Sequence, residues 1–246
     1  MDLTDRGDGT RLANERLPGR APTVVFLPGF RSTMDGEKAV ALAARCAATG
    51  QAMLRLDYSG HGRSEGRFVD CTIGRWTADA LSLLDRTEGP VVLVGSSMGG
   101  WIALLLALAR PERVAALVGI AAAPDFTERL MWDAMLPREQ AALQSLGTLQ
   151  VPTPYGAPFP LTWRLVEEAR AHLLLDAPVA LHCPVRLLHG QADAEVPWET
   201  ASRLAARLAS ADVRTTLVKD ATHRFSRPQD LALLCQVVAE TIECFT

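Results

Sequence analysis

The sequence predicts an α/β protein: a largely parallel sheet with helices on both faces. From residue 23 to residue 245, short apolar runs alternate with longer segments of helical periodicity, which is the order that repeated strand–helix units produce. The apolar runs are continuous, as is typical of strands covered on both faces. A length of 246 residues suits one such domain that carries an insertion.

Six apolar runs are predicted to be strands, at residues 23–28, 52–57, 90–95, 114–120, 184–189 and 213–218. Five helical patterns lie between and after them, at residues 36–48, 76–86, 98–109, 199–209 and 228–244. Pro111 follows the third of these patterns, as expected for a residue that cannot continue a helix.

Residues 124–180 interrupt the alternation. They contain amphipathic pieces and the cluster PTPYGAPFP, but no run that predicts a strand. Excursions of this length within a compact domain are usually functional. We therefore predict an α/β core formed by residues 1–123 and 181–246, into which residues 124–180 are inserted as a small helical lid.

Composition and charge argue against several classes of protein. The chain is 48% hydrophobic and 22% charged with a net charge of -3, so there is no surplus of basic groups to neutralise nucleic-acid phosphates. The longest apolar run, MGGWIALLLALA, is shorter than the ~18 residues that indicate a membrane span. We expect neither a nucleic-acid partner nor a membrane span.

The cysteines and the N-terminal segment bear on the compartment. Five cysteines are scattered without a C-x-x-C pair, which predicts inert thiols in a reducing compartment, not a zinc site or a disulfide framework. The first twenty residues lack the apolar stretch of a signal peptide and include acidic residues. We expect a mature cytosolic N-terminus, a cytoplasmic protein, and no metal or cofactor.

The stretch VLVGSSMGGW carries the strongest chemical signal. Its G-x-S-x-G frame selects Gly95, Ser97 and Gly99 and excludes Ser96. An apolar strand precedes the motif and a buried helix follows it, the setting of a nucleophilic serine on a strand-to-helix turn. The alternative is a glycine-rich turn in which Ser97 caps the helix.

A nucleophilic serine needs a base and an acid, which in this setting follow it along the chain. His223 is the favoured base, because it lies in a polar loop after the last predicted strand. Asp193, just past a strand end, is the favoured acid; Asp220 and Glu195 are its rivals. As a triad, Asp193 would orient the imidazole of His223 and stabilise its charged form.

An acyl-transfer site also needs donors for the developing oxyanion. The backbone N–H of Met98, directly after the serine, is one candidate. The other is the N–H of Phe30 in the loop FLPGFRSTMDG, where Gly29 permits a tight turn; an ordinary Pro-Gly turn is the alternative. The spacing of this loop does not fit a phosphate-binding loop, so nucleotide binding is rejected.

The segments LPGF, DYSGHGRSEG, GSSMGG, LLHGQADAEVP and His223 together resemble the α/β-hydrolase superfamily from residue 23 to the C-terminus. FLPGF, GSSMGGW, CPVRLLHG and VPW resemble more closely its mitochondrial palmitoyl-protein thioesterases, also described as acyl-glucuronide esterases. The resemblance implies a serine esterase or thioesterase with a catalytic triad of Ser97, Asp193 and His223, under a lid. Dehalogenases and epoxide hydrolases of this superfamily use an Asp nucleophile, whereas position 97 is Ser.

Substrate choice is expected to lie in residues 124–180. Six large side chains there are candidates for lining a pocket for an apolar acyl chain: Met131, Trp132, Met135, Tyr155, Phe159 and Trp163. The competing interpretation is that helical spacing simply packs this segment against the body. An acyl-protein thioesterase, a general small-ester carboxylesterase and a catalytically idle binding protein on the same fold all remain open.

Overall fold

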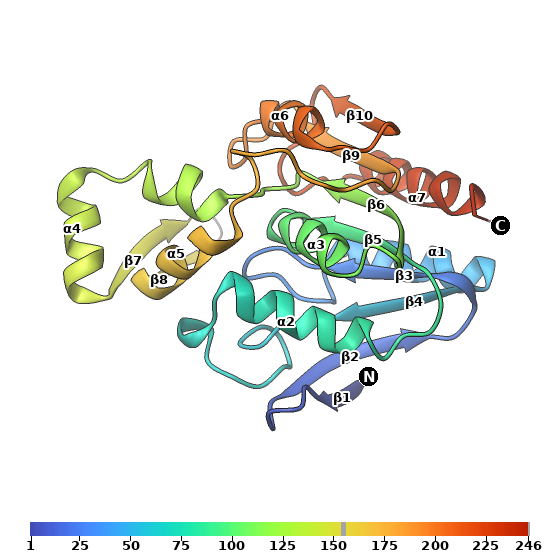
Figure 1. Ribbon diagram of the computed structural model, residues 1–246, viewed down its shortest axis with the longest axis horizontal. Coiled ribbons are helices and arrows are strands. Elements are labelled where there is room, and N and C mark those ends of the chain that lie inside the picture. Colours follow the sequence, from blue (N-terminus) through green and yellow to red (C-terminus); the bar gives the residue numbers. More distant parts are fainter. Residues whose placement is uncertain (154–155, 246) are drawn as a thin grey trace.

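The computed structural model describes residues 1–153 and 156–245. In this part of the chain an eight-stranded sheet runs through the molecule in the order β1-β2-β4-β3-β5-β6-β9-β10 (Figure 1). The strands are β1 (Asp2–Asp5), β2 (Arg11–Leu17), β3 (Arg20–Leu27), β4 (Gln51–Leu56), β5 (Val91–Ser96), β6 (Val114–Ile120), β9 (Val185–Gly190) and β10 (Val213–Val218). From β4 to β10 every pairing is parallel, whereas β1 and β2 pair antiparallel.

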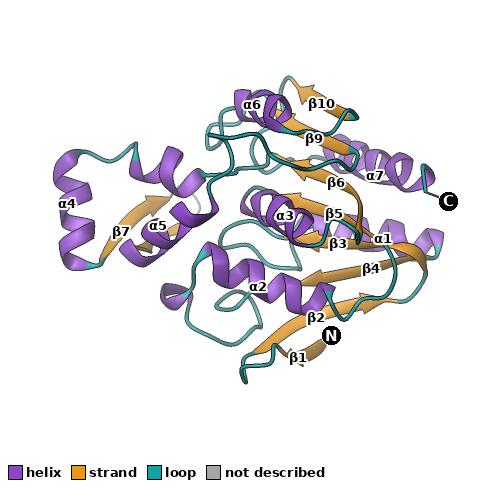
Figure 2. Ribbon diagram, viewed as in Figure 1, coloured by secondary structure: helices purple, strands orange, loops and turns teal. Residues whose placement is uncertain are grey.

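Helices cover both faces of this sheet (Figure 2). One core packs the sheet against α2 (Ile73–Leu84), α3 (Met98–Ala109) and α6 (Glu199–Arg207). The other packs it against α1 (Glu37–Thr49) and α7 (Pro228–Glu243). Successive residues of β3 and β5 alternate between the two cores, because neighbouring side chains of a strand point to opposite faces. The predicted mostly parallel sheet with helices on both faces is confirmed.

The six predicted strands are all present, but two N-terminal strands were missed. β1 and β2 read DLTD and RLANERL, so neither has the continuous apolar character that identified the others. β2 forms because its backbone pairs antiparallel with β4. Pairing of this kind depends on a partner distant in sequence and leaves a weak local signal.

The prediction that residues 124–180 lack strands was wrong. Besides α4 (Pro137–Leu146) and α5 (Trp163–Ala169), the segment forms an antiparallel hairpin of β7 (Thr148–Thr153) and β8 (Gly156–Thr162). These elements project to one side of the main sheet in Figure 1. Prolines in both strands argued against this assignment, but a hairpin of two strands consists of edges, where a missing N–H is tolerated.

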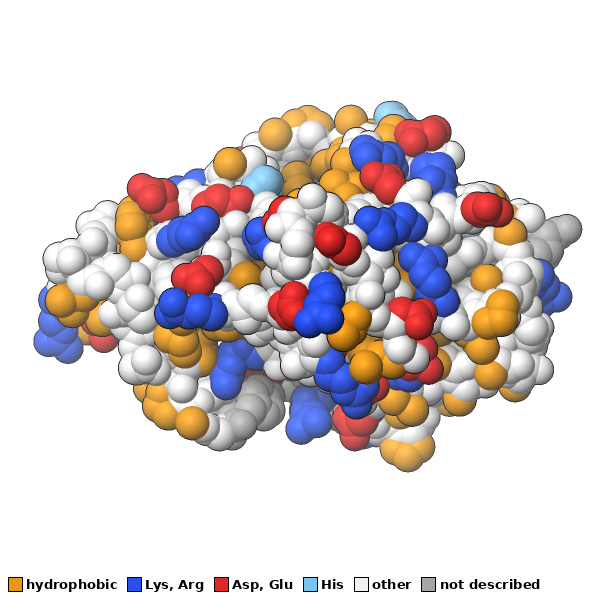
Figure 3. Space-filling view, turned by 90° about the horizontal axis from the view of Figure 1, so that it is seen from below, with side chains coloured by type: hydrophobic (Ala, Val, Ile, Leu, Met, Phe, Trp, Pro, Cys, Tyr) orange, Lys and Arg blue, Asp and Glu red, His pale blue; other side chains and the backbone are white. Residues whose placement is uncertain are grey.

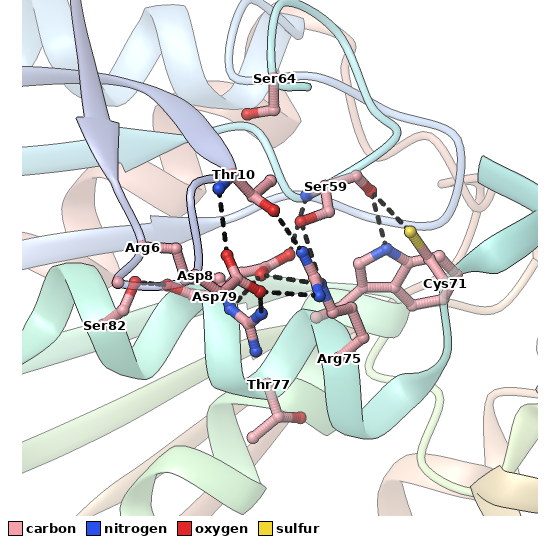
Figure 4. Close-up of polar contacts among 12 residues, drawn as sticks. Arg6, Asp8, Thr10, Ser59, Ser64, Cys71, Arg75, Thr77, Asp79 and Ser82 are labelled. Carbon is pink, nitrogen blue, oxygen red and sulfur yellow. Dashed lines mark hydrogen bonds and ion pairs between the residues drawn. The ribbon is translucent and has the colours of Figure 1, made fainter. Parts of the chain in front are cut away.

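A buried ionic cluster ties the N-terminal hairpin to α2 (Figure 4). The fully buried carboxylate of Asp79 lies 2.9 Å from Nε of Arg6 and 3.6 Å from Nε of Arg75, and it accepts a hydrogen bond from the backbone N–H of Ser59. Burial raises the pKa of Asp79, and the Ser59 hydrogen bonds and the two guanidinium groups oppose that rise. The cluster fixes Ser59 in the loop of residues 57–66, which borders the site described below.

Asp79→Ala is expected to lower the free energy of unfolding by about 3 kcal/mol, because it removes the buried carboxylate that faces Nε of Arg6 and leaves that largely buried guanidinium only its contact with the exposed Asp8. Urea unfolding followed by circular dichroism measures this loss. Asp85→Ala is the matched control, since it removes an exposed carboxylate that pairs with Arg110 and should leave stability almost unchanged. Equal losses in the two variants would contradict a stabilising role for the buried cluster.

The surface shows no segregation of charge on the face drawn in Figure 3, where acidic and basic side chains are interspersed. Within residues 1–153 and 156–245, none of the helices combines the length and the apolar character needed to cross a membrane.

Candidate active site

Ser97 stands on a sharp turn between β5 and α3. Its backbone has φ 55° and ψ -119°, a conformation that non-glycine residues seldom adopt. Close packing holds the turn: a Cβ added at Gly99 would lie 2.0 Å from the backbone oxygen of Leu27. The N–H of Ser97 donates to the carbonyl of Ile120 on the neighbouring strand β6. The hydroxyl is therefore presented at the carboxyl end of the sheet.

His223 and Asp193 lie in line with this hydroxyl. Nε2 of His223 is 3.0 Å from Oγ of Ser97, and its Nδ1 is 2.8 Å from Oδ2 of Asp193. Asp193 follows β9 and His223 follows β10, two adjacent parallel strands, so their loops meet at one edge of the sheet. A hydrogen bond from the N–H of Ala192 to the carbonyl of Ala221 joins the two loops.

Asp193 is held as a charged acceptor. Its side chain is fully buried, and Oδ1 accepts the backbone N–H groups of Glu195 and Val196. Burial pushes the pKa of Asp193 upward, but hydrogen bonds from His189, His223 and the backbone outweigh it and hold the pKa well below its usual range. The carboxylate therefore stays ionised throughout the pH range in which a histidine titrates.

The rival acids lie elsewhere. Asp220 is exposed at the turn after β10, and Oε2 of Glu195 is 4.0 Å from Nε2 of His223, on the side that faces the serine and not on the Nδ1 side. Two other histidines that follow Ser97 in the chain also point elsewhere: His172 contacts Glu168 at 2.9 Å, and His182 is exposed. Of the residues proposed for a triad, the structure brings together Ser97, Asp193 and His223.

The loop after β3 lies against the serine. A Cβ added at Gly29 would be 3.3 Å from Cβ of Ser97, so a larger residue there would crowd the hydroxyl. Arg31 has φ 58°, and its N–H donates to Nε2 of His61 at 3.1 Å. The loop thus approaches Ser97 in a conformation that a buried histidine supports.

His61 is fixed as a neutral acceptor by its surroundings. Its Nδ1 lies 3.3 Å from the carbonyl oxygen of Ser59, so Nδ1 donates there and Nε2 accepts from Arg31. Burial lowers the pKa of His61 to about 4, so this acceptor persists at neutral pH. Asp57 has a similar role, because its carboxylate accepts the N–H groups of Met34 and Arg63 and so joins the loop after β3 to the loop after β4.

A cavity of about 650 Å³ opens beside Ser97 and His223, within the size range of small-molecule sites. One part of its wall is apolar and comes from the loop after β3 and from the segment 124–180: Phe30, Phe126, Leu130, Met131, Val151 and Phe159. Another part is polar and includes Arg31, Lys38, Glu195 and Arg224. The site therefore presents a hydroxyl, a histidine and an apolar wall to one space.

The structure divides the six side chains proposed for the pocket. Met131 and Phe159 line the cavity. Trp132, Met135 and Trp163 do not line it in the described part of the chain; the two indoles pack on each other at 5.0 Å, under the guanidinium of Arg170. All three side chains are partly buried and pack against the hydrophobic core. Tyr155 lies outside the described residues.

Sequence reasoning missed the contributions of two side chains to this site. The ring of Phe30, expected to matter only through its N–H, makes edge contacts with Phe68, Trp76, Phe126 and Phe159 at 5.2–6.0 Å. His189, the last residue of the predicted strand 184–189, contacts Asp193. The signal for His189 was its place at the carboxyl end of β9, four residues before Asp193, where both side chains face the same edge.

Comparison with known proteins places the chain in a family. Residues 20–158 match the serine aminopeptidase S33 family (Hydrolase_4). The chain is 40% identical to the mouse protein named palmitoyl-protein thioesterase ABHD10, mitochondrial, over 99% of its own length and 82% of that protein's length. The chain belongs to the α/β-hydrolase superfamily and is a hydrolase of its serine type.

Solved structures agree. Mouse α/β hydrolase domain-containing protein 10 superimposes with a TM-score of 0.93 at 40% identity, covering 100% of this chain and 99% of that one. A putative hydrolase from Agrobacterium vitis S4 superimposes with a TM-score of 0.92 at 38% identity, covering 98% of this chain and 96% of that one. The name of the mouse relative places it in mitochondria, and the cytoplasmic location expected here stays a prediction.

Proposed function

We propose that this protein hydrolyses acyl esters or thioesters through an acyl-enzyme on Ser97, and that its substrates carry an apolar acyl chain. The observation that carries the proposal is the chain of contacts from Ser97 Oγ through His223 to Asp193, beside a cavity with an apolar wall. A hydroxyl within reach of an imidazole, itself oriented by a buried carboxylate, is the arrangement of an activated nucleophile.

In the first step, Nε2 of His223 takes the proton of Ser97 as Oγ attacks the acyl carbon. Asp193 stabilises the imidazolium that forms. The tetrahedral oxyanion is held by the backbone N–H groups of Met98 and Phe30. His223 then gives its proton to the departing alcohol or thiol, leaving the acyl group on Ser97.

In the second step, water attacks the acyl-enzyme while His223 again acts as base. The acid is released and the serine regains its proton. The support for the oxyanion donors is positional: Met98 begins α3, and Gly29 brings the β3 loop against Ser97. No metal or cofactor is required by these steps.

The substrate class is argued from the cavity wall and the relatives. Residues 124–180 act as a lid in this proposal, supplying Met131, Val151 and Phe159 to the acyl side. The 40% identical mouse relative is named a palmitoyl-protein thioesterase, which favours long-chain acyl groups on proteins. A general carboxylesterase acting on small esters is the second candidate, and the polar part of the cavity wall would suit its short substrates.

The test is a matched series of acyl esters and acyl thioesters from acetyl to palmitoyl, with kcat/KM measured for each. We expect kcat/KM to rise with chain length, because each added methylene buries apolar area worth ~0.8 kcal/mol at most. We also expect it to be higher for thioesters, since the mouse relative is named a thioesterase. Activity that falls with every added carbon would overturn the long-chain assignment in favour of the carboxylesterase. Lack of labelling of Ser97 by a fluorophosphonate probe would oppose an activated serine.

A further inference from the structure

We propose that His189 is a second histidine of the active site, a positioning residue that donates a hydrogen bond to Asp193 and so sets how strongly that carboxylate acts on His223. The inference rests on the proposed function of Ser97, His223 and Asp193. His189 is completely buried at the carboxyl end of β9. Its Nε2 lies 3.2 Å from Oδ2 of Asp193, the same oxygen that accepts Nδ1 of His223 at 2.8 Å.

The contacts of His189 define its tautomer. Nε2 also faces the carbonyl oxygen of Val196 at 3.1 Å. Two acceptors at one ring nitrogen require that nitrogen to carry the proton. Nδ1 is buried and has no hydrogen-bond partner among the described residues, so a proton there would be a buried, unsatisfied donor. These contacts therefore assign the proton of His189 to Nε2.

This donor does two things to the acid. It ties both ends of the Asp193 turn, because the ring sits at the end of β9 and contacts Val196 as well as Asp193. It also stabilises the negative charge of Oδ2, the oxygen that faces His223. A stabilised oxygen is less basic and therefore attracts the imidazolium less strongly. Removing the donor should leave Asp193 looser and its Oδ2 more basic.

Few other charged groups of the described residues lie near His189, Asp193 and His223. Among the described residues, Glu195 lies 4.0 Å from Nε2 of His223, and Lys38 of α1 and Arg224 border the same cavity. For His189 itself, Asp193 is the charged group in contact within the described part of the chain. None of these groups changes in the variants below, so a shifted pH profile would report on the His189 donor.

The experiment compares His189→Gln with His189→Met. Gln extends to the same point and keeps an N–H donor, whereas Met has similar length and shape without one. We expect His189→Met to lower kcat/KM about tenfold, as loss of one hydrogen bond to a charged group would. We also expect the acidic limb of its pH profile to move upward by roughly half a unit to one unit. His189→Gln should stay near wild type in both.

A second readout needs no turnover. The proton that His223 donates to Asp193 should resonate far downfield in the proton NMR spectrum, and it should move in His189→Met but not in His189→Gln. Equal behaviour of the two variants, whether both match wild type or both lose activity without a shift of the limb, would overturn the inference and leave His189 a packing residue. Ser97→Ala runs in the same assay: if it keeps activity, the proposed function fails, while the NMR comparison still decides whether His189 acts on Asp193.

Discussion

Ser97→Ala is expected to lower kcat by about 10⁶-fold. The variant removes Oγ, the atom 3.0 Å from Nε2 of His223, and without it no acyl-enzyme forms. The fold should survive, because the turn is held by backbone contacts to Leu27 and Ile120 that alanine keeps. The measurement is the initial rate on an activated acyl ester, with the free energy of unfolding measured in parallel.

Ser96→Ala is the internal control for this experiment. Ser96 is the last residue of β5 and immediately precedes the turn, but the G-x-S-x-G frame does not include it. Its variant should keep most of the wild-type kcat. Activity that survives in Ser97→Ala, or that disappears equally in Ser96→Ala, would show that Ser97 is not the nucleophile.

Asp193→Asn should cost about 10⁴-fold in kcat, the second largest effect. The amide has nearly the shape of the carboxylate but lacks its charge, and its NH₂ can face Nδ1 of His223 as a donor. The histidine would then carry its proton on Nε2, the nitrogen that must accept the proton of Ser97. The rate is measured on the same ester from pH 5 to pH 9.

Two controls separate this effect from a general loss of charge. Asp220→Asn changes an exposed carboxylate three residues before His223, and Glu195→Gln changes the carboxylate 4.0 Å from Nε2 of His223. Neither should approach the loss in Asp193→Asn. If Asp220→Asn were the more damaging variant, the assignment of the acid would be wrong.

The sequence predicted those parts of the protein that have a strong local signal. Continuous apolar runs identified β3, β4, β5, β6, β9 and β10, because a strand buried on both faces has no polar positions to dilute the pattern. The turn at Ser97 was equally local: the spacing of Gly95 and Gly99 follows from the close approach of one strand and one helix. His223 could be named because a polar loop after the last strand is itself a local feature.

Other features depended on which distant segments the fold brings together. Asp193 and His223 are 30 residues apart, and Ser97 and His223 are 126 apart. The local pattern could therefore rank the three candidate acids but could not show which of them contacts His223. The choice follows from the adjacency of β9 and β10, which brings the two loops together.

The same reason explains the errors in the segment 124–180 and at His189. The β7–β8 hairpin is stabilised by cross-strand pairing despite prolines that weaken the local strand signal. Trp132 and Trp163, 31 positions apart in sequence, were indistinguishable from pocket residues until their mutual contact at 5.0 Å was known. His189 reads as a buried strand residue, and only the return of the chain at Asp193 and Val196 turns it toward the acid. Local patterns thus predicted the sheet and the candidate nucleophile, whereas long-range packing decides which carboxylate contacts His223, which side chains line the cavity and that His189 faces Asp193, because these contacts are defined by strand order and not by neighbours in sequence.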